Sequence, residues 1–264
     1  MDGIESCKEE GILVSKKPIN VYWSDILQPW SDTDWSFLYP KPKTLFSNLI
    51  QERNDPKDTG SFFLCPAVST KFKKMLVFNF PIDASYNYGY NEVESKIIPT
   101  SRNYIPASSV RKEALKEKPS FEFSLSWLFF SDEDLSVYFT PPFFHSPEYM
   151  QYGTVVPGEF NIGSWFRPFK FEMQTWKKEG DIVFKENEPL FYAEFKTDRP
   201  IIFHRFVENE KLMKYRNAVV KHKMFVGSFK PLSDKYQKFK DVGYKEKILT
   251  EIKKNLVDEE PFRF

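Results

Sequence analysis

A mainly β fold, an antiparallel sandwich or barrel with a two-helix C-terminal extension, is what this sequence predicts. Apolar and polar residues alternate in several short segments before residue 207, and the periodicity becomes helical after it. Aromatic residues make up 18% of the 264 residues, which is too much apolar surface for a disordered chain. We therefore predict a β-rich domain over residues 1–207, with an N-terminal wrapping segment, and a helical extension over 208–264.

The charge balance and the cysteine count narrow the class of protein further. Lys and Arg number 38 against 37 Asp and Glu, which argues against a generic polyanion binder. Two cysteines make no disulfide framework, and the first residues lack the basic and apolar regions of a signal peptide. No apolar run approaches the roughly 20 residues that a membrane span needs. We expect a cytoplasmic protein that does not associate with membranes.

The first 119 residues contain few periodic segments. Trp23, Trp30 and Trp35 stand among several prolines, and we expect them to cover one end of the sheet. Residues 44–53 are helix-like and residues 75–80 resemble a strand. We interpret residues 81–119 as a long irregular loop with one or two helical turns at 111–118, and a loop of this length usually serves a function or rests on a partner.

The clearest predicted strand covers residues 120–127. Phe121, Phe123, Leu125 and Trp127 alternate with polar residues, which places the four apolar side chains on one sheet face and leaves the other face in water. Residues 169–173 and 200–206 are further strands. Residues 181–185 and 190–196 flank a turn-like segment, so we predict that they form a hairpin.

Two apolar stripes at helical spacing follow Glu208. Both must dock on the β domain or on another subunit, because short isolated helices are marginal in water. The second predicted helix carries Gly243 in its interior. Residues 208–254 hold 13 Lys and Arg against six Asp and Glu, so this segment is either the solvated face of packed helices or a surface for nucleic acid or another acidic partner. The stripes are Leu212, Tyr215 and Val219, then Phe239, Val242, Leu249, Ile252 and Leu256.

Patterns for catalysis, metals and cofactors are missing from the sequence. The three histidines are far apart, and no Gly-rich phosphate loop or Gly-x-Ser-x-Gly motif occurs. We predict no metal and no cofactor, and we assign no catalytic residue. Cys65, between Leu64 and Pro66, is expected to be a small core residue.

The richest segment for ligand binding is residues 157–168. Gly158 and Gly163 favour a sharp turn, and Trp165 with Arg167 would present a stacking face and a planar cation. Alternatively, Trp165 caps the core and Arg167 pairs with a carboxylate such as Glu194 on the predicted hairpin. The preceding aromatic segment, residues 140–147 with His145, lines a pocket beside that turn or forms the edge of the core.

Several short motifs follow one another in a characteristic order: Thr140-Pro141-Pro142, Gly158, Trp165, Pro168-Phe169, Gly180-Asp181-Ile182 and Glu188-Pro189-Leu190. On these motifs, over about residues 120–206, the chain resembles an uncharacterised all-β family of phages and bacteria. This resemblance implies no activity, but it implies a phage-encoded protein of the host cytoplasm or virion. The hairpin is also similar in outline to the β-clip barrel of trimeric dUTPases and dCTP deaminases, whose uracil-binding stretch resembles residues 82–86 with Asp83 and Tyr86.

Three hypotheses about function follow. The first is a non-enzymatic β-domain protein that binds a partner protein or assembles with itself, because Tyr, Trp and Phe are suited to interfaces. The second is a nucleotide-handling enzyme of the β-clip type, which requires Asp83, Tyr86, Trp165 and Arg167 in one pocket. The third is nucleic-acid binding through the basic residues of 208–254.

Overall fold

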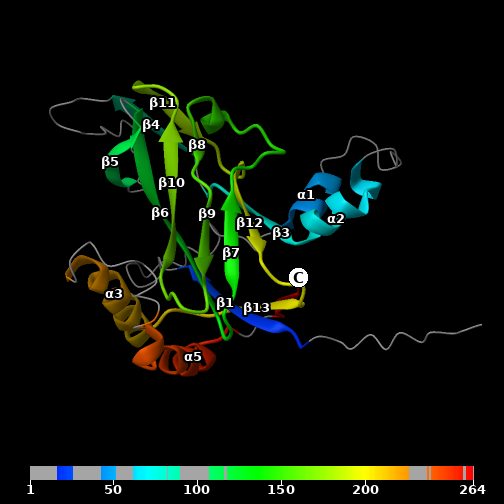
Figure 1. The fold of residues 1–264 in the computed structure, drawn as a ribbon, viewed down its shortest axis with the longest axis vertical. Helices are drawn as coiled ribbons and strands as arrows, with labels where there is room; N and C mark the ends of the chain where they lie inside the picture. The colour runs from blue at the N-terminus through cyan, green and yellow to red at the C-terminus, as the bar shows by residue number, and fades with distance from the viewer. Residues whose placement is uncertain are drawn as a thin grey trace, which may run out of the picture.

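A computed structural model shows two β-sheets stacked face to face, with a pair of helices on the outer face of each sheet (Figure 1). The fold is therefore mainly β, as predicted. The described residues are 17–25, 43–51, 62–81, 83–89, 107–115, 118–225, 237, 239–257 and 260–263.

The first sheet has seven strands, in the order β14-β13-β1-β6-β10-β8, with β5 also paired to β6. All its pairs are antiparallel except that of β1 with β13, which is parallel. Its strands are β1 (Ile19–Asp25), β5 (Ala107–Leu115), β6 (Lys118–Ser131), β8 (Gly153–Val155), β10 (Pro168–Thr175), β13 (Ile201–Arg205) and β14 (Phe262–Arg263).

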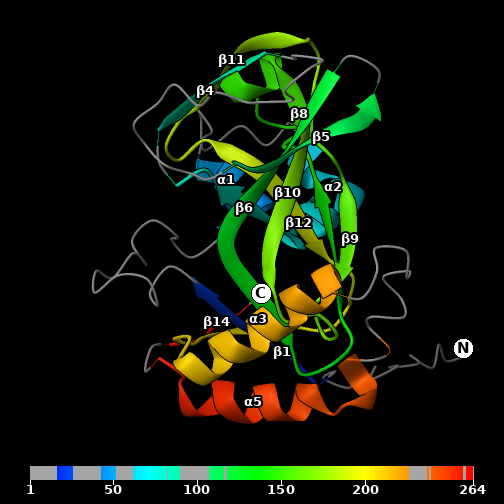
Figure 2. The same cartoon turned by 90° about the vertical axis from the view of Figure 1, so that its left-hand side faces the viewer.

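The second sheet has five strands in the order β2-β3-β12-β7-β9. A two-stranded ribbon, β4 with β11, lies at one end of the sandwich (Figure 2). All these pairs are antiparallel. The strands are β2 (Lys43–Thr44), β3 (Met75–Asn79), β4 (Ala84–Gly89), β7 (Ser136–Thr140), β9 (Gly158–Asn161), β11 (Glu179–Phe184) and β12 (Pro189–Phe195).

The predicted hairpin of residues 181–185 and 190–196 is wrong. β11 pairs with β4, whereas β12 pairs with β3 and β7. The segment between β11 and β12 instead faces the segment between β3 and β4. There, the Phe80 amide donates to the Glu188 carbonyl at 2.8 Å, and the Asn187 amide donates to the Phe80 carbonyl at 3.0 Å. Residues 75–89, which are distant in sequence, supply the partner strands of both β11 and β12. The segment between β11 and β12 is therefore a bend in a long two-stranded arrangement and not a hairpin turn.

The main core lies between the two sheets, and strands of both contribute alternate side chains to it. Leu76 and Phe78 of β3 point into it, as do Phe191, Ala193 and Phe195 of β12. From the seven-stranded sheet come Val21 and Trp23 of β1 and Phe121, Trp127 and Phe129 of β6. Residues 120–206 thus contribute strands to both sheets. Two strands from the N-terminal part of the chain pair with them: β1 with β6 and β13, and β3 with β12.

Both faces of β6 are buried, which corrects the prediction that one face is wet. Leu128 and Phe130 point away from the main core and are covered by the C-terminal helices. Ser120 and Glu122 are buried as well. Residues 127–130 form a continuous apolar run, which is typical of a strand covered on both faces.

The C-terminal helices α3 (Glu210–Phe225) and α5 (Tyr244–Lys254) cover the outer face of the seven-stranded sheet. Their docking was predicted, but the second stripe is partly wrong: Val242 and Leu256 are 48% and 41% exposed, whereas Ile248 is fully buried. Gly243, at φ 60°, precedes α5 as its N-cap and does not lie inside a helix. The shared cluster contains Tyr22, Leu128, Phe130, Phe166, Phe206, Leu212, Phe239, Ile248 and Ile252.

The N-terminal helices α1 (Leu45–Gln51) and α2 (Pro66–Lys73), with the short η3 (Phe62–Leu64), cover the five-stranded sheet. A further 3-10 turn, η4 (Glu148–Gln151), precedes β8. The cluster beneath α1 and α2 contains Leu45, Phe72, Met75, Val77 and Tyr192.

Two predictions for the first 119 residues need correction. Part of the N-terminal segment does not wrap the sheet but enters it as β1, which lies between β13 and β6 and buries Trp23. The predicted irregular loop of residues 81–119 contains the strands β4 and β5, and its predicted helical turns at 111–118 are strand up to Leu115, because β5 pairs with β6. Trp30 and Trp35 lie outside the described residues.

Candidate interaction surface

Trp165 and Arg167 contact each other and line a small depression. Trp165 is buried, and the Arg167 guanidinium lies 5.2 Å from the centre of its ring. The depression that both residues line with Phe160, Phe169 and Lys170 has space for about one water molecule. Glu194 forms its salt bridge with Lys196, at 2.9 Å.

Tyr86 lies on β4 of the ribbon and Asp83 directly precedes that strand, at the other end of the sandwich. The Asp83 carboxylate accepts a hydrogen bond from the Glu186 amide at 2.8 Å, and Tyr86 is buried against Phe184. Trp165 and Arg167 precede the start of β10, whereas the ribbon follows its end (Figure 2). The eight residues of β10 span about 26 Å. The four residues of the nucleotide hypothesis therefore do not meet in one pocket.

Within the described ranges, no three His, Cys, Asp or Glu side chains gather as a metal site requires. His204 hydrogen-bonds through Nε2 to the Asn20 side-chain oxygen at 2.9 Å and stacks on Tyr22. Burial lowers the pKa of His204, with the Asp132 carboxylate opposing the shift. These contacts describe a histidine that joins β13 to β1.

His145 joins the aromatic loop, residues 141–147, to both α1 and β12. Its Nε2 lies 3.0 Å from Asn48 Oδ1, and its Nδ1 is hydrogen-bonded to the Tyr192 hydroxyl. The tautomer that fits has the proton on Nε2, which donates to Asn48, while Nδ1 accepts from Tyr192. The Phe144 amide donates to the same hydroxyl at 3.3 Å. Three hydrogen bonds thus fix the position of this loop.

The fixed loop presents two large aromatic side chains to solvent. Phe143 is 52% exposed and Phe144 is 40% exposed. Their inner edges pack on the cover of the five-stranded sheet, with Phe144 at 4.8 Å from Phe72 and Phe143 at 5.0 Å from Tyr192 between ring centres. Packing on one side and water on the other are typical of side chains at a binding surface.

The adjoining helices add two exposed aliphatic side chains. Leu64, at the end of η3, is 68% exposed, and Ile50, near the end of α1, is 40% exposed. The Phe46 and Phe63 rings pack edge to face at 5.9 Å and connect α1 to η3. We call Ile50, Leu64, Phe143 and Phe144 the apolar surface. Figure 1 shows that α1 and α2 project from the sandwich on the side opposite to α3.

Cys65 lies beside this surface and is exposed, which corrects the prediction that it is a core residue. It is the N-cap of α2, and Pro66 occupies the first helical position. The sequence Leu64-Cys65-Pro66 therefore marks a helix start, where Pro is well tolerated, and not a buried strand.

The basic C-terminal segment uses several of its cations within the protein. Arg216 forms a buried salt bridge with Glu208, Lys211 pairs with Glu251 at 2.8 Å, and Lys240 pairs with Asp134 at 2.7 Å. Lys245 is half-buried, and burial lowers its pKa. Lys247 and Lys253 are exposed.

Sequence reasoning found part of the apolar surface and missed the rest. The aromatic loop and His145 were candidates because aromatics and prolines crowd there. Leu64 and Ile50 were missed, because η3 has three residues and α1 has seven, and such short elements give too little periodicity to show which apolar residue faces outwards.

No helix of the described residues is long and apolar enough to cross a bilayer. The chain matches no protein-family model, no curated protein and no solved structure.

Proposed function

We propose that this protein is a non-enzymatic binding protein that docks a partner protein on the apolar surface formed by Ile50, Leu64, Phe143 and Phe144. The observation that supports the proposal most directly is the exposure of these four large apolar side chains on adjoining elements. Large exposed apolar residues gathered in one region mark interaction sites, whereas single scattered ones need no explanation.

The rigidity of the aromatic loop supports the same function. Binding is weakened when flexible segments must be ordered, so a surface that is already fixed keeps more of its interaction energy. The contacts of His145 with Asn48 and Tyr192 fix the loop to two separate elements. His145 is therefore a positioning residue, and Phe143 and Phe144 are the residues that would contact the partner.

The two alternative functions have less support. A nucleotide enzyme of the β-clip type needs Asp83, Tyr86, Trp165 and Arg167 together. Trp165 and Arg167 precede β10, whereas Asp83 and Tyr86 belong to the ribbon segment that pairs with β11, after the end of β10. Nucleic-acid binding through residues 208–254 needs cations directed to solvent, and Lys211, Arg216 and Lys240 form intramolecular salt bridges.

Site-specific photo-crosslinking tests the proposal. A benzophenone side chain is placed at Leu64 in the full-length protein, and in a matched control at Val242, which is exposed just before the start of α5. We expect a discrete protein adduct from position 64 in an extract of the source cells, reduced by Phe143→Ser, and none from position 242. Equal adducts from both positions, or an adduct that Phe143→Ser leaves unchanged, would contradict the proposal.

A further inference from the structure

The elements around the apolar surface carry one sign of charge. In the described residues of 43–51 and 62–81 the ionisable side chains that bear charge at neutral pH are Lys43, Lys71, Lys73 and Lys74, with no Asp or Glu. The whole segment 43–81 holds six Lys and Arg against three Asp and Glu, in a chain whose net charge is only +1. The elements that carry Ile50 and Leu64 thus belong to a segment with a local excess of positive charge.

Two of these lysines are placed to meet a bound partner. Lys71 and Lys73 are exposed in the last turn of α2, on either side of Phe72, whose ring contacts Phe144. The Lys73 ammonium lies 4.9 Å from the centre of the Phe46 ring, so the cation is held close to the aromatic side chains. Lys74 pairs with Asp198. A helix C-terminus favours lysine by itself, but Lys43 lies on β2, outside that helix.

We propose that the partner docks through an acidic protein segment that also carries large apolar side chains. This inference rests on the proposed function, and it adds the chemistry of the partner. Its apolar side chains would cover Leu64, Phe143 and Phe144, while its carboxylates would lie near Lys71 and Lys73. Complementary charge of this kind determines which partners are accepted and speeds the encounter.

A protein segment suits the surface better than a nucleic acid does. Single-stranded nucleic acids bind along cationic grooves lined with aromatic side chains that stack on the bases. Here the most exposed apolar residue is the aliphatic Leu64, and Ile50 is aliphatic too. Aliphatic side chains are covered effectively by apolar protein side chains, which form the centre of protein interfaces.

Peptide selection against the full-length protein tests the inference. A displayed library of random 12-residue peptides is the probe, and the enriched peptides are synthesised and titrated by fluorescence anisotropy. We expect enriched sequences with a net negative charge and at least two large apolar residues. Their affinity should fall at least about tenfold in Lys71→Glu/Lys73→Glu, and less than about twofold in the matched control Lys247→Glu/Lys253→Glu.

A second variant separates this inference from the proposed function. Leu64→Ser/Phe143→Ser should abolish binding of the same peptides, and thermal unfolding shows whether each variant is folded. Neutral or basic peptides that Leu64→Ser/Phe143→Ser abolishes, or peptides insensitive to Lys71→Glu/Lys73→Glu, would overturn the acidic partner and leave the proposed function standing. Peptides that bind equally to both variants would overturn both.

Two further measurements identify a different occupant. Tighter binding of a 20-nucleotide oligo-dT than of any selected peptide, lost in Lys71→Glu/Lys73→Glu, would replace the acidic segment with nucleic acid. A dimer seen by sedimentation velocity and dissociated by Leu64→Ser would replace it with a second copy of this chain. A monomer that binds oligo-dT weakly is the result that the inference expects.

Discussion

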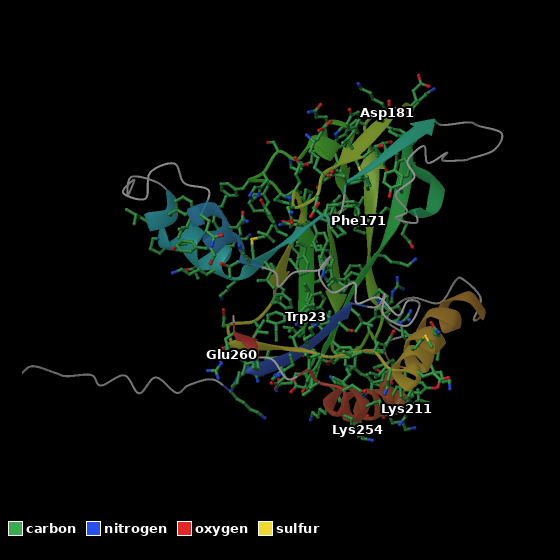
Figure 3. The ribbon with its side chains drawn as sticks, turned by 180° about the vertical axis from the view of Figure 1, so that it is seen from behind. Trp23, Phe171, Asp181, Lys211, Lys254 and Glu260 are labelled. Carbon is green, nitrogen blue, oxygen red and sulfur yellow. The ribbon has the colours of Figure 1, made fainter. Side chains whose placement is uncertain are left out.

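The two pairs of helices that cover the sandwich each bury the apolar outer face of one sheet, but their own surfaces differ. Both sheets have apolar outer faces: Tyr22, Leu128 and Phe130 on the seven-stranded sheet, and Met75, Val77 and Tyr192 on the five-stranded sheet. The C-terminal cover, which we call the closed cover, places several charges in salt bridges around its apolar contacts, although Val242 and Leu256 are exposed there. The N-terminal cover, which we call the open cover, exposes Ile50 and Leu64 beside Phe143 and Phe144. Figure 3 labels Lys211 and Lys254 on the C-terminal cover, far from Asp181 on the ribbon.

The charged contacts of the C-terminal cover are specific to their positions. Arg216 makes two hydrogen bonds to the buried Glu208 carboxylate, at 2.7 and 3.0 Å. Glu251 of α5 accepts hydrogen bonds from Asn209 and Lys211, just before and within α3. Such contacts fix two helices on a sheet, so this cover has a structural role. The comparison indicates that the open cover is the one whose exposed apolar side chains are available to a partner.

Arg216→Met should have the largest effect on the closed cover. It leaves the Glu208 carboxylate buried without its cation, and breaking a buried pair in this way costs about 3–5 kcal/mol of unfolding free energy. Urea unfolding at neutral pH measures the loss. Burial already raises the pKa of Glu208 while Arg216 lowers it, so the variant should recover stability as the pH falls towards the ordinary pKa of a glutamate.

Lys214→Met is the matched control for Arg216→Met. Lys214 forms an exposed pair with Glu210 on the same helix, at 3.2 Å, and such pairs contribute about 0.3–0.5 kcal/mol. A loss of unfolding free energy below about 1 kcal/mol in Arg216→Met, or equal losses in the two variants, would contradict this account. It would show that the buried Arg216–Glu208 pair does not hold the closed cover in place.

Gly163→Ala should disturb the turn that connects the sheets to the C-terminal cover. A Cβ at Gly163 would overlap the backbone carbonyl of Glu133, in the turn whose Asp134 pairs with Lys240. The backbone must shift, and we expect a loss of about 1–3 kcal/mol, measured by thermal unfolding. Gly158→Ala is the control, since the nearest atom to its new Cβ is 3.7 Å away, in Phe160. Similar losses in both would contradict this account.

Acid should weaken the closed cover before the open one. The hydrogen bond from Lys240 lowers the pKa of Asp134, and the hydrogen bond from Lys211 lowers that of Glu251. A carboxyl with a lowered pKa stabilises the fold above its unfolded pKa, and this contribution is lost as the pH falls through the folded value. Hydrogen exchange should therefore show α5 losing protection below about pH 4, with α2 less affected.

Lys240→Met sharpens the acid experiment, because it removes the main cause of the Asp134 shift. The variant should lose stability at neutral pH and less of it on acidification, so its curve of unfolding free energy against pH is flatter. A curve parallel to that of the wild type would show that Asp134 does not contribute to the acid sensitivity of the C-terminal cover.

Leu64→Ser should have the smallest effect on stability, because Leu64 is mostly in water. We expect the unfolding free energy to change by less than about 0.5 kcal/mol. Ile248→Ser, at a fully buried position of the closed cover, is the contrast and should destabilise strongly. If Leu64→Ser destabilised the protein as Ile248→Ser does, the two covers would both be structural.

The sequence predicted individual strands well where local pattern and tertiary environment agree. Phe121 and Trp127 point into the main core as their alternation indicates, and Leu212, Tyr215 and Val219 face the sheet from α3. The side chains of Phe123 and Leu125 lie outside the described residues, so their positions stay predictions. The helix around Gly243 was placed wrongly, because a stripe alone does not show where one helix ends and the next begins.

Sequence alone therefore determined the fold class and the two-helix end, because periods of two and of 3.6 residues are local properties of the chain. Only the tertiary structure decided which strands pair. β11 and β12 follow one another in sequence but take their partners from β4 and β3, which lie 90 to 119 residues earlier in the paired registers. The same limit applies to the apolar surface. Whether Leu64 or Phe143 is buried depends on what packs beside it, because the residue type alone does not show whether an apolar side chain lies in a core or on a binding surface.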